Sequence, residues 1–303
     1  MGLSKIQKIL RNPALLFLTL GQRGFFNWMS DEQYLKIAYR IKMGKKLNLE
    51  NPQTFNEKLQ WLKLHDRRPE YTMMVDKYLV KDYVAGIIGA EHIIPTIGVW
   101  DDPDEIDFDA LPERFVLKCN HNSGLGMCIC KDKSKLNIRK VKAELRKGLK
   151  QNYYFSNREW PYKNVPRKII AEQYMEDESG YELFDYKFMC FNGEVKCSFV
   201  CSDRFSSEGL KVTFYDLDWN VMPFERHYPK AQKPIPKPQS YEQMIAFAER
   251  LSRDIPFVRV DFYEINGQVY FGELTFYPGA GLEEFAPEEW DYRLGSWITL
   301  PEK

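Results

Sequence analysis

The sequence predicts an α+β protein in which a helical amino-terminal region precedes a body built mainly of antiparallel strands. Two observations support this class. Before residue 90 the apolar residues recur at helical spacing in three segments, and after Ile93 they gather in short runs typical of strands. With 303 residues, 44% hydrophobic and 28% charged, the chain can bury a sizeable core. We expect a helical region over residues 1–90 and an α+β body over residues 91–303.

Three helices are expected in the amino-terminal region. The first covers residues 31–42 and ends in basic residues before Gly44. The second begins at Thr54, an N-cap residue with Glu57 three positions later, which is the pattern of a capping box. The third is expected to run without a break over residues 71–86.

Seven strand-like runs follow, and two helical segments interrupt them, at residues 137–150 and 241–253. The runs read HIIPTIGVW, RFVLKC, MCICK, RKIIAEQYM, YKFMCFNG, VKCSFVCS and KVTFYD. Most are short and follow one another closely, which favours antiparallel pairing.

The stretch over residues 257–281 adds a hairpin with one acid on each strand. The runs FVRVDFY and QVYFGEL flank Asn266-Gly267, a pair that favours a tight hairpin turn. In that register Asp261 and Glu273 come side by side, where they repel unless a cation lies between them. Oxygen ligands of this kind suit Mg²⁺ or Mn²⁺. The alternative is a hairpin whose acids simply face water.

A second informative stretch is the loop within residues 115–130. A short apolar strand ends in Lys118, which is costly to bury unless it meets an anion. Gly124 and Gly126 allow backbone amides to approach a ligand, and Ser123 adds a donor, so the loop could hold phosphate. It is neither a P-loop nor a dinucleotide-binding glycine motif. His121 is either a base or phosphate contact, or a residue that caps the loop.

Charge and cysteine content exclude several classes of function. The formal net charge is zero, which argues against a general nucleic-acid binder. The six cysteines lie between residues 119 and 201, and none forms a C-x-x-C pair. We therefore expect reduced thiols in a cytoplasmic protein.

Residues 5–28 combine basic positions with an apolar run, but the run is too short for a bilayer span and lacks a cleavage site. We expect a helix docked on the protein's own core. The alternative is an amphipathic segment that contacts a partner or a membrane surface, which for a cytoplasmic protein is the inner face of the membrane.

Taken together and in this order, the motifs resemble the ATP-grasp superfamily and, within it, the TupA-like ATP-grasp proteins associated with surface-polysaccharide genes. The resemblance covers roughly residues 51–301. It is carried by NPQTFNEKLQWLK, VDKYLVKDYV, FVLKCNHNSGLG, AEQYM, DYKFMCFNGEV, VRVDFY, GELTFYPGAG and LGSWITLP. It implies an ATP-grasp fold in which two α+β subdomains sandwich ATP, with the phosphate loop in residues 91–170 and the metal site in residues 171–303.

The resemblance also implies roles for individual residues. Lys77 and Lys118 would contact the phosphates. Ser123, Gly124 and Gly126 would form the loop that closes over them. The segment that receives adenine would be Glu172, Gln173, Tyr174 and Met175. An acid-x-base pair facing the nucleotide or acceptor would be Asp185 and Lys187. Arg259 would stabilise an oxyanion, and the metal ligands would be Asp261, Glu273 and Thr275.

One departure from the superfamily pattern concerns the metal site. Many ATP-grasp ligases carry E-x-N, whereas this chain has Glu273-Leu274-Thr275. A threonine hydroxyl is a weaker Mg²⁺ ligand than an amide oxygen, so the second metal position is in question.

The activity implied by the resemblance is ATP-dependent ligation of a carboxylate to an amine through an acylphosphate, with a surface polysaccharide or its precursor as the substrate. The alternative is a glycosyltransferase that uses a nucleotide sugar, because D-x-D occurs at Asp216–Asp218 and at Asp102–Asp104. A third alternative, raised by Thr275, is a nucleotide-binding scaffold without turnover.

Overall fold

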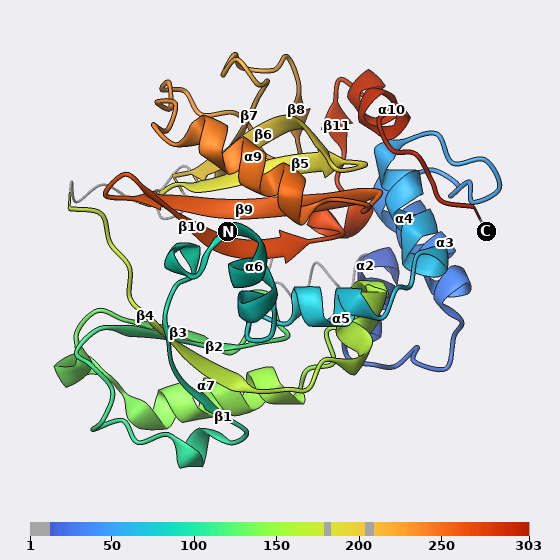
Figure 1. Cartoon of the computed structure of the whole chain (residues 1–303). Helices are drawn as coiled ribbons and strands as arrows, with labels where there is room; N and C mark the ends of the chain where they lie inside the picture. The colour runs from blue at the N-terminus through green and yellow to red at the C-terminus, as the bar shows by residue number, and fades with distance from the viewer. Residues whose placement is uncertain (1–12, 179–182, 204–208, 303) are drawn as a thin grey trace, which may run out of the picture.

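The computed structural model describes residues 13–178, 183–203 and 209–302. Two antiparallel sheets form the body of the protein, and Figure 1 shows helices α5 (Glu70–Val75) and α6 (Val80–Ile88) between them. The α+β class predicted from the sequence is confirmed.

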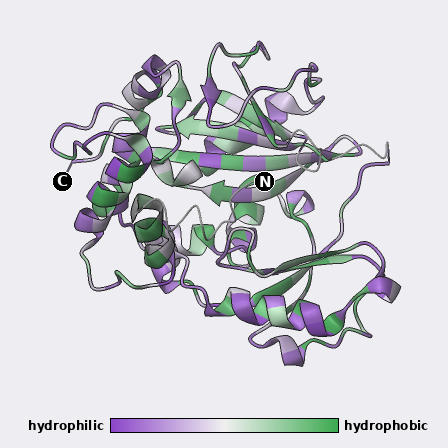
Figure 2. Cartoon of the chain, turned by 180° about the vertical axis from the view of Figure 1, so that it is seen from behind, coloured by the Kyte–Doolittle hydropathy of each residue, from purple (hydrophilic) through white to green (hydrophobic). Residues whose placement is uncertain are grey.

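The first sheet has four strands in the order β1-β4-β2-β3. Their bounds are β1 Thr96–Trp100, β2 Phe115–Cys119, β3 Met127–Cys130 and β4 Ile169–Gln173. Helix α7 (Ile138–Lys150) covers one face, where Val141 and Leu145 pack on Phe115 and Leu117. Figure 2 shows the mixture of hydrophilic and hydrophobic residues that fits α7 to a sheet on one side and water on the other. The opposite face of the sheet is turned toward the second sheet.

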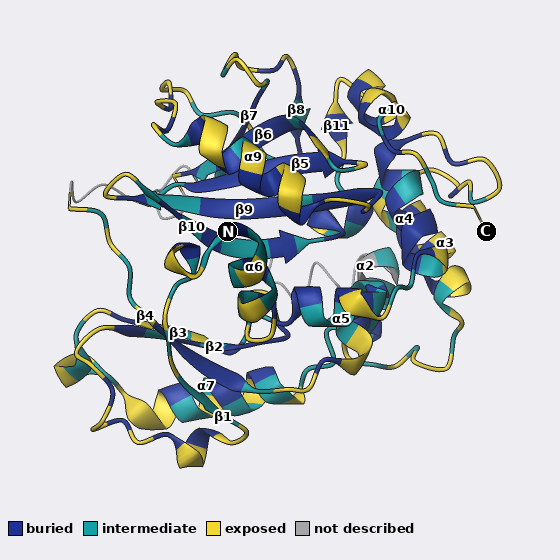
Figure 3. Cartoon of the chain, viewed as in Figure 1, coloured by how far each residue is buried: buried dark blue, intermediate teal, exposed yellow. Residues whose placement is uncertain are grey.

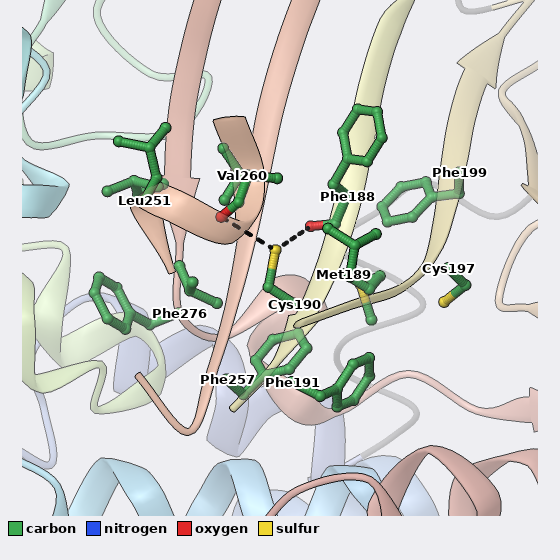
Figure 4. Close-up of a cluster of buried hydrophobic side chains, with 14 of the residues drawn as sticks. Phe188, Met189, Cys190, Phe191, Cys197, Phe199, Leu251, Phe257, Val260 and Phe276 are labelled. Carbon is green, nitrogen blue, oxygen red and sulfur yellow. Dashed lines mark hydrogen bonds between the residues drawn. The ribbon is translucent and has the colours of Figure 1, made fainter. Parts of the chain in front are cut away.

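The second sheet has five strands in the order β10-β9-β5-β6-β7. Their bounds are β5 Asp185–Phe191, β6 Glu194–Ser202, β7 Lys211–Tyr215, β9 Phe257–Ile265 and β10 Gln268–Thr275. Helix α9 (Tyr241–Leu251) packs against it, and the thiol of Cys190 lies 3.8 Å from the carbonyl oxygen of Ala248 (Figure 4). The aromatic and sulfur side chains in Figure 4 belong to the largest buried cluster of the described chain. All six cysteines are free thiols, as the sequence predicts.

Five helices form the described amino-terminal region, and they are α2 Pro13–Gln22, α3 Asp31–Met43, α4 Phe55–His65, α5 Glu70–Val75 and α6 Val80–Ile88. Helices α3 and α4 lie at one end of the two sheets, and α5 and α6 lie between the sheets (Figure 1). The predicted ends of two helices are confirmed. Gly44 closes α3 in a left-handed conformation, and Thr54 with Glu57 forms a complete capping box at the start of α4.

The third predicted helix was wrong in one respect, because residues 71–86 form two helices with a break at residues 76–79. The break has two causes. Asp76 Oδ1 accepts the backbone N–H groups of Tyr78 at 2.8 Å and Leu79 at 3.3 Å, and so stabilises the turn that precedes α6. The backbone N–H of Lys77 donates to the carbonyl oxygen of Asn120 at 3.1 Å, outside any helix.

The remaining elements are short or peripheral. They are α8 Tyr154–Asn157, β8 Glu225–Arg226, β11 Phe285–Ala286, α10 Glu289–Ser296 and, in the described ranges, five 3₁₀ turns that include Trp160–Asn164 and Pro278–Gly281. Strands β8 and β11 pair with each other. Within the described ranges no helix has both the length and the apolar character needed to cross a bilayer.

Candidate functional site

The hairpin of β9 and β10 forms as predicted, with a two-residue turn at Asn266-Gly267. Both residues have positive φ, at 52° and 75°, and Ile265 pairs with Gln268 on either side of them. A register shift between Phe271 and Glu273 then brings Glu273 directly opposite Asp261. The two acids are therefore neighbours across adjacent strands.

Arg259 joins the two carboxylates. Its Nε donates to Asp261 Oδ1 at 2.6 Å, and its Nη2 donates both to Asp261 Oδ2 at 2.6 Å and to Glu273 Oε1 at 2.8 Å. Glu273 Oε1 also accepts the hydroxyl of Thr275 at 3.1 Å. A planar guanidinium that serves two carboxylates in this way fixes the orientation of both.

A lysine on the neighbouring strand β5 also contacts Asp261. Lys187 on β5 is paired with Asp261 in the sheet register, and its Nζ contacts Asp261 Oδ2 as well as Asp185 Oδ2, the latter at 2.6 Å. Asp261 is only 1% exposed. Asp185 and Lys187, the acid-x-base pair noted in the sequence, are thus in contact with each other, and Lys187 also contacts Asp261.

Lys77 reaches this cluster from the break between α5 and α6. Its Nζ lies 3.3 Å from Glu273 Oε2, while its backbone is bound to Asn120 at the end of β2. A continuous helix would not leave the Lys77 backbone available to Asn120, so the break in residues 76–79 is what places this lysine between the two sheets. We call Asp185, Lys187, Arg259, Asp261, Glu273 and Lys77 the hairpin cluster.

The hairpin cluster contains three acids and three bases. Burial opposes ionisation of Glu273, but Lys77 and Arg259 outweigh it and hold the pKa of this carboxyl well below its usual range. Burial also acts against the charge on Lys187, yet Asp185 and Asp261 raise its pKa. The pKa of Asp261 is raised by burial, against the lowering effect of Arg259 and Lys187.

Two carboxylates of the hairpin cluster and a neighbouring hydroxyl offer the kind of oxygen atom that Mg²⁺ prefers. Asp261, Glu273 and the hydroxyl of Thr275 place such atoms close together on the sheet. In the parts of the chain that the structure describes, no three or more His, Cys, Asp or Glu residues are grouped so that they could enclose a metal ion. Mg²⁺ is typically held by one or two carboxylates together with substrate phosphates, so two acids suffice when phosphate is present.

A second charged cluster lies on the four-stranded sheet. Lys118 Nζ on β2 is 2.5 Å from Glu172 Oε2, and Lys81 Nζ on α6 is 2.8 Å from Glu172 Oε1. Burial alone would raise the pKa of Glu172, but Lys118 and Lys81 together lower it. We call Lys81, Lys118 and Glu172 the sheet cluster.

Lys77 and Lys81 are four residues apart and connect the two clusters. Lys77 contacts Glu273 of the hairpin cluster, and Lys81 contacts Glu172 of the sheet cluster. The sequence analysis missed Lys81, because its partner Glu172 is distant in the chain. The lysine at position 81 within VDKYLVKDYV was the available signal.

The glycine loop divides into an open part and a packed part. Ser123 and Gly124 are exposed, and a Cβ at Gly124 would meet no atom within 4 Å, although its φ of 79° favours glycine. Gly126 is buried, and a Cβ there would lie 2.6 Å from Cys119 Sγ and 2.9 Å from Gly148 Cα. Gly126 therefore also allows the loop to pack closely on α7.

His121 caps the loop rather than facing a ligand. Its ring nitrogens lie 3.1 Å from the carbonyl oxygen of Gln151 and 3.3 Å from Asn120 Oδ1. Burial lowers the pKa of His121 to about 4, so the ring is neutral at pH 7.

The segment expected to receive adenine has two parts. Glu172 and Gln173 lie within β4 and pair with neighbouring strands, and the Glu172 side chain belongs to the sheet cluster. Tyr174 and Met175 follow the end of β4. Arg114 and Lys131 lie over the Tyr174 ring at 5.6 and 5.9 Å from its centroid.

Two tyrosines that the sequence analysis missed lie near the hairpin cluster. The rings of Tyr153 and Tyr162 are 4.7 Å apart between centroids. Glu159, burial and Glu273 together hold the pKa of Tyr153 above its usual value, and a hydrogen bond with Ser123 acts in the opposite direction. The glycine loop and the hairpin cluster thus share a neighbour in Tyr153.

The two D-x-D motifs serve local structure. Asp216 Oδ1 accepts the backbone N–H groups of Asp218 at 3.0 Å and Asn220 at 2.8 Å, which closes a turn after β7. Asp102 caps a 3₁₀ turn, and Asp104 pairs with Lys142 and Arg146.

A known protein family is similar to most of this chain. The model of the TupA-like ATP-grasp family matches residues 57–299. The chain belongs to the TupA-like ATP-grasp family. It therefore has the ATP-grasp fold that the motifs implied. No curated protein matches the chain.

Solved structures of similar fold include D-alanine–D-alanine ligases and the ATP-grasp ligase PsnB. D-alanine–D-alanine ligase from Bacillus anthracis, complexed with ATP, is 15% identical over 67% of this chain and 54% of its own, with a TM-score of 0.40. The Helicobacter pylori enzyme of the same name is 15% identical over 80% of this chain and 69% of its own, with a TM-score of 0.46. The ligase PsnB, in a complex with Mg and ADP, is 10% identical over 73% of this chain and 57% of its own, with a TM-score of 0.39. This chain thus spans little more than half the length of two of the three.

Proposed function

We propose that this protein joins a carboxylate to an amine at the expense of ATP, with Mg²⁺ as the metal, and that the carboxylate belongs to a surface polysaccharide or its precursor. The observation that carries the proposal is the position of Lys77. It connects the hairpin cluster to the end of β2, and Lys81 connects the same helical segment to the sheet cluster. A nucleotide held between the sheets would meet cations on one side and metal-binding carboxylates on the other.

The bound nucleotide would interact with charged side chains that pair with one another in the protein without nucleotide. Lys118 and Lys77 are neutralised by Glu172 and Glu273, so phosphate oxygens would become additional partners for both lysines. Ser123 and Gly124 are exposed and able to approach phosphate through the loop backbone. Tyr174 and Met175, beyond the end of β4, are the positions we assign to the base.

In the proposed reaction the substrate carboxylate attacks the γ-phosphorus of ATP, and ADP leaves. The amine then attacks the acylphosphate carbon, phosphate leaves, and the amine loses one proton. Arg259 would stabilise the oxyanion of the tetrahedral intermediate, while Asp261 and Glu273 fix the guanidinium. Mg²⁺ held by Asp261, Glu273 and the phosphates would neutralise phosphate charge. Thr275 orients Glu273 through its hydroxyl, whether or not it binds a second ion.

The polysaccharide substrate and the cytoplasmic location are parts of the same proposal. The six free thiols fit a reducing compartment where ATP is available. Tyr153 and Tyr162 beside the hairpin cluster offer ring faces against which the apolar face of a sugar can pack.

The test has two stages. Thermal unfolding is measured with Mg-ATP and with nucleotide-diphosphate sugars, and stabilisation by Mg-ATP is expected. ADP release is then measured for uronic acids combined with amino acids or amino sugars, and it should depend on both partners. Stabilisation by a nucleotide sugar but not by Mg-ATP would favour the glycosyltransferase alternative. Mg-ATP binding without ADP release in any combination would leave the scaffold alternative.

A further inference from the structure

The first 47 residues carry an excess of positive charge that the rest of the chain lacks. They contain nine Lys or Arg residues and two Asp or Glu residues, although the whole chain has 43 of each kind. Charge segregated in this way points to an anionic partner for that region. Lys5, Lys8 and Arg11 lie outside the described residues, whereas the other six basic residues lie within residues 13–47.

Two aromatic side chains stand out from this region. Phe25 is 62% exposed and Trp28 is 79% exposed, the highest values among the large hydrophobic residues of the described chain. The segment that carries them is anchored from within, because Phe26 stacks on Phe17 with centroids 4.4 Å apart and its carbonyl oxygen accepts Arg158 Nη2 at 2.6 Å. Phe25 and Trp28 are therefore held outward by a fixed turn.

Helix α3 begins directly after this turn, and its outer side is basic and apolar. Ser30 caps it, and its buried side packs Tyr34, Leu35, Ala38 and Tyr39. On the outer side a groove of about 340 Å³ is lined by Lys36, Ile37, Arg40, Ile41, Lys46 and Leu47. Figure 3 shows exposed residues along α3. The helix has 13 residues, so this surface extends over about 20 Å.

The cations of this surface are only partly neutralised. Lys36 pairs with Glu32 at 2.5 Å, and Lys45 pairs with Glu288. In the described part of the chain, Arg40, Lys42 and Lys46 form no ion pair with an acid. These three positive charges beside an apolar groove are complementary to a partner that is both anionic and apolar.

We propose that Phe25, Trp28 and the outer side of α3 dock this protein on a membrane surface that contains anionic phospholipids. Exposed Trp and Phe insert at the boundary between headgroups and acyl chains, and Lys and Arg attract the anionic headgroups. A nucleic acid would use the same cations but gain little from the apolar groove and its outward aromatic residues. The inference does not depend on the ligase reaction, since none of its residues belongs to the hairpin or sheet cluster.

The experiment is flotation of the full chain, without nucleotide, with vesicles of phosphatidylcholine alone or of phosphatidylcholine and phosphatidylglycerol. Binding is expected with the second kind only, and it should weaken as salt is added. Replacing both Arg40 and Lys46 by Gln should lower the partition coefficient about 30-fold, since each surface cation contributes about 1 kcal/mol. Replacing Phe25 and Trp28 by Ser should lower it at least about tenfold.

Matched controls are Tyr292→Ser, an exposed aromatic residue on α10, and Lys135→Gln, an exposed cation elsewhere. Both should bind vesicles as the unchanged protein does, and all variants should unfold at similar temperatures. Equal binding to both vesicle types, or binding that neither double variant weakens, would overturn the proposal. So would binding that double-stranded DNA abolishes and that the Phe25/Trp28 double variant leaves unchanged. Because ADP release is measured separately, failure here leaves the proposed ligase activity untouched.

Discussion

Asp261 and Glu273 lie opposite each other on β9 and β10, and a single nitrogen of Arg259 is 2.6 Å from one and 2.8 Å from the other. The shared guanidinium holds the two carboxylates close together. Any cation entering between them therefore competes with, or adds to, a guanidinium already in place. The balance of three acids and three bases in the hairpin cluster is therefore the feature that substitutions should disturb first.

Replacing Asp261 by Asn should abolish ADP release and retain the fold. Asn preserves the size of the side chain but removes the charge, while Lys187 keeps Asp185 and Arg259 keeps Glu273 as partners. We expect a loss of stability of about 1–3 kcal/mol and a fall in turnover of at least about a thousandfold. Turnover is measured by ADP release and folding by circular dichroism.

The matched control is Asp216→Asn in the D-x-D turn after β7. This change should leave ADP release near its original level, because Asp216 only caps a turn. If Asp261→Asn retained turnover while Asp216→Asn lost it, the assignment of the site to the hairpin cluster would be wrong.

Lys81 and Lys118 should contribute differently although both contact Glu172. Lys118 is the more exposed of the two, at 22% against 12%, and it lies at the end of the strand that leads into the glycine loop. Lys81 also donates to the carbonyl oxygen of Ile94 and to Thr96 Oγ1, both at 2.8 Å. We expect Lys118→Ala to abolish ATP turnover and stabilisation by Mg-ATP, and Lys81→Ala to lower the stability of the free protein by about 2–4 kcal/mol.

Thermal unfolding of both variants with and without Mg-ATP separates these effects. A Lys118→Ala protein that Mg-ATP still stabilised as much as the original would contradict the phosphate role. Similar unfolding temperatures for the free Lys81→Ala and original proteins would contradict the structural one.

The sequence predicts those features that depend on local chemistry. The capping box at Thr54 and the turn at Asn266-Gly267 each need only a few adjacent residues, and both form as expected. The break at residues 76–79 could not be predicted in this way, because the apolar spacing of residues 71–86 fits one helix. A backbone hydrogen bond from Lys77 to Asn120 helps to end α5 there. Only the folded chain brings Asn120 close enough to form it.

The same limit applies to the partners of the site residues. Lys118, Asp261 and Glu273 were identified because charged side chains interrupt apolar strands. Glu172 contacts two lysines only because α6 lies against the sheet. No local sequence pattern encodes that packing.

Lys63 should be important for stability, because it joins three segments next to the site. Its Nζ is fully buried and donates to Gln60 Oε1 at 3.0 Å, to the carbonyl oxygen of Asn157 at 3.0 Å and to that of Ala280 at 2.8 Å. Ala280 has a φ of 57°. This left-handed backbone conformation is unfavourable for a residue other than glycine unless the surrounding structure holds it in place. Replacing Lys63 by Met should lower the free energy of unfolding by about 3 kcal/mol.

The comparison for this change is Lys58→Met on the same helix, where a single hydrogen bond to the carbonyl oxygen of Ile298 is lost. Its expected cost is about 1 kcal/mol. Both are measured by urea unfolding, and equal costs for the two variants would contradict the role assigned to Lys63.

Stability should fall as the pH is lowered from 6.5 to 4, in part because of His121. Burial lowers the pKa of His121 to about 4, against an ordinary value of 6.5. In this range the unfolded chain binds a proton that the folded chain excludes, so acid favours unfolding. The difference corresponds to about 3 kcal/mol lost by pH 4. His121→Gln should remove that share of the slope of unfolding free energy against pH, whereas His227→Gln, at an exposed position, should retain it. Parallel slopes for all three proteins in urea unfolding would show that His121 is protonated equally in both states, and that the buried, neutral ring described here is wrong.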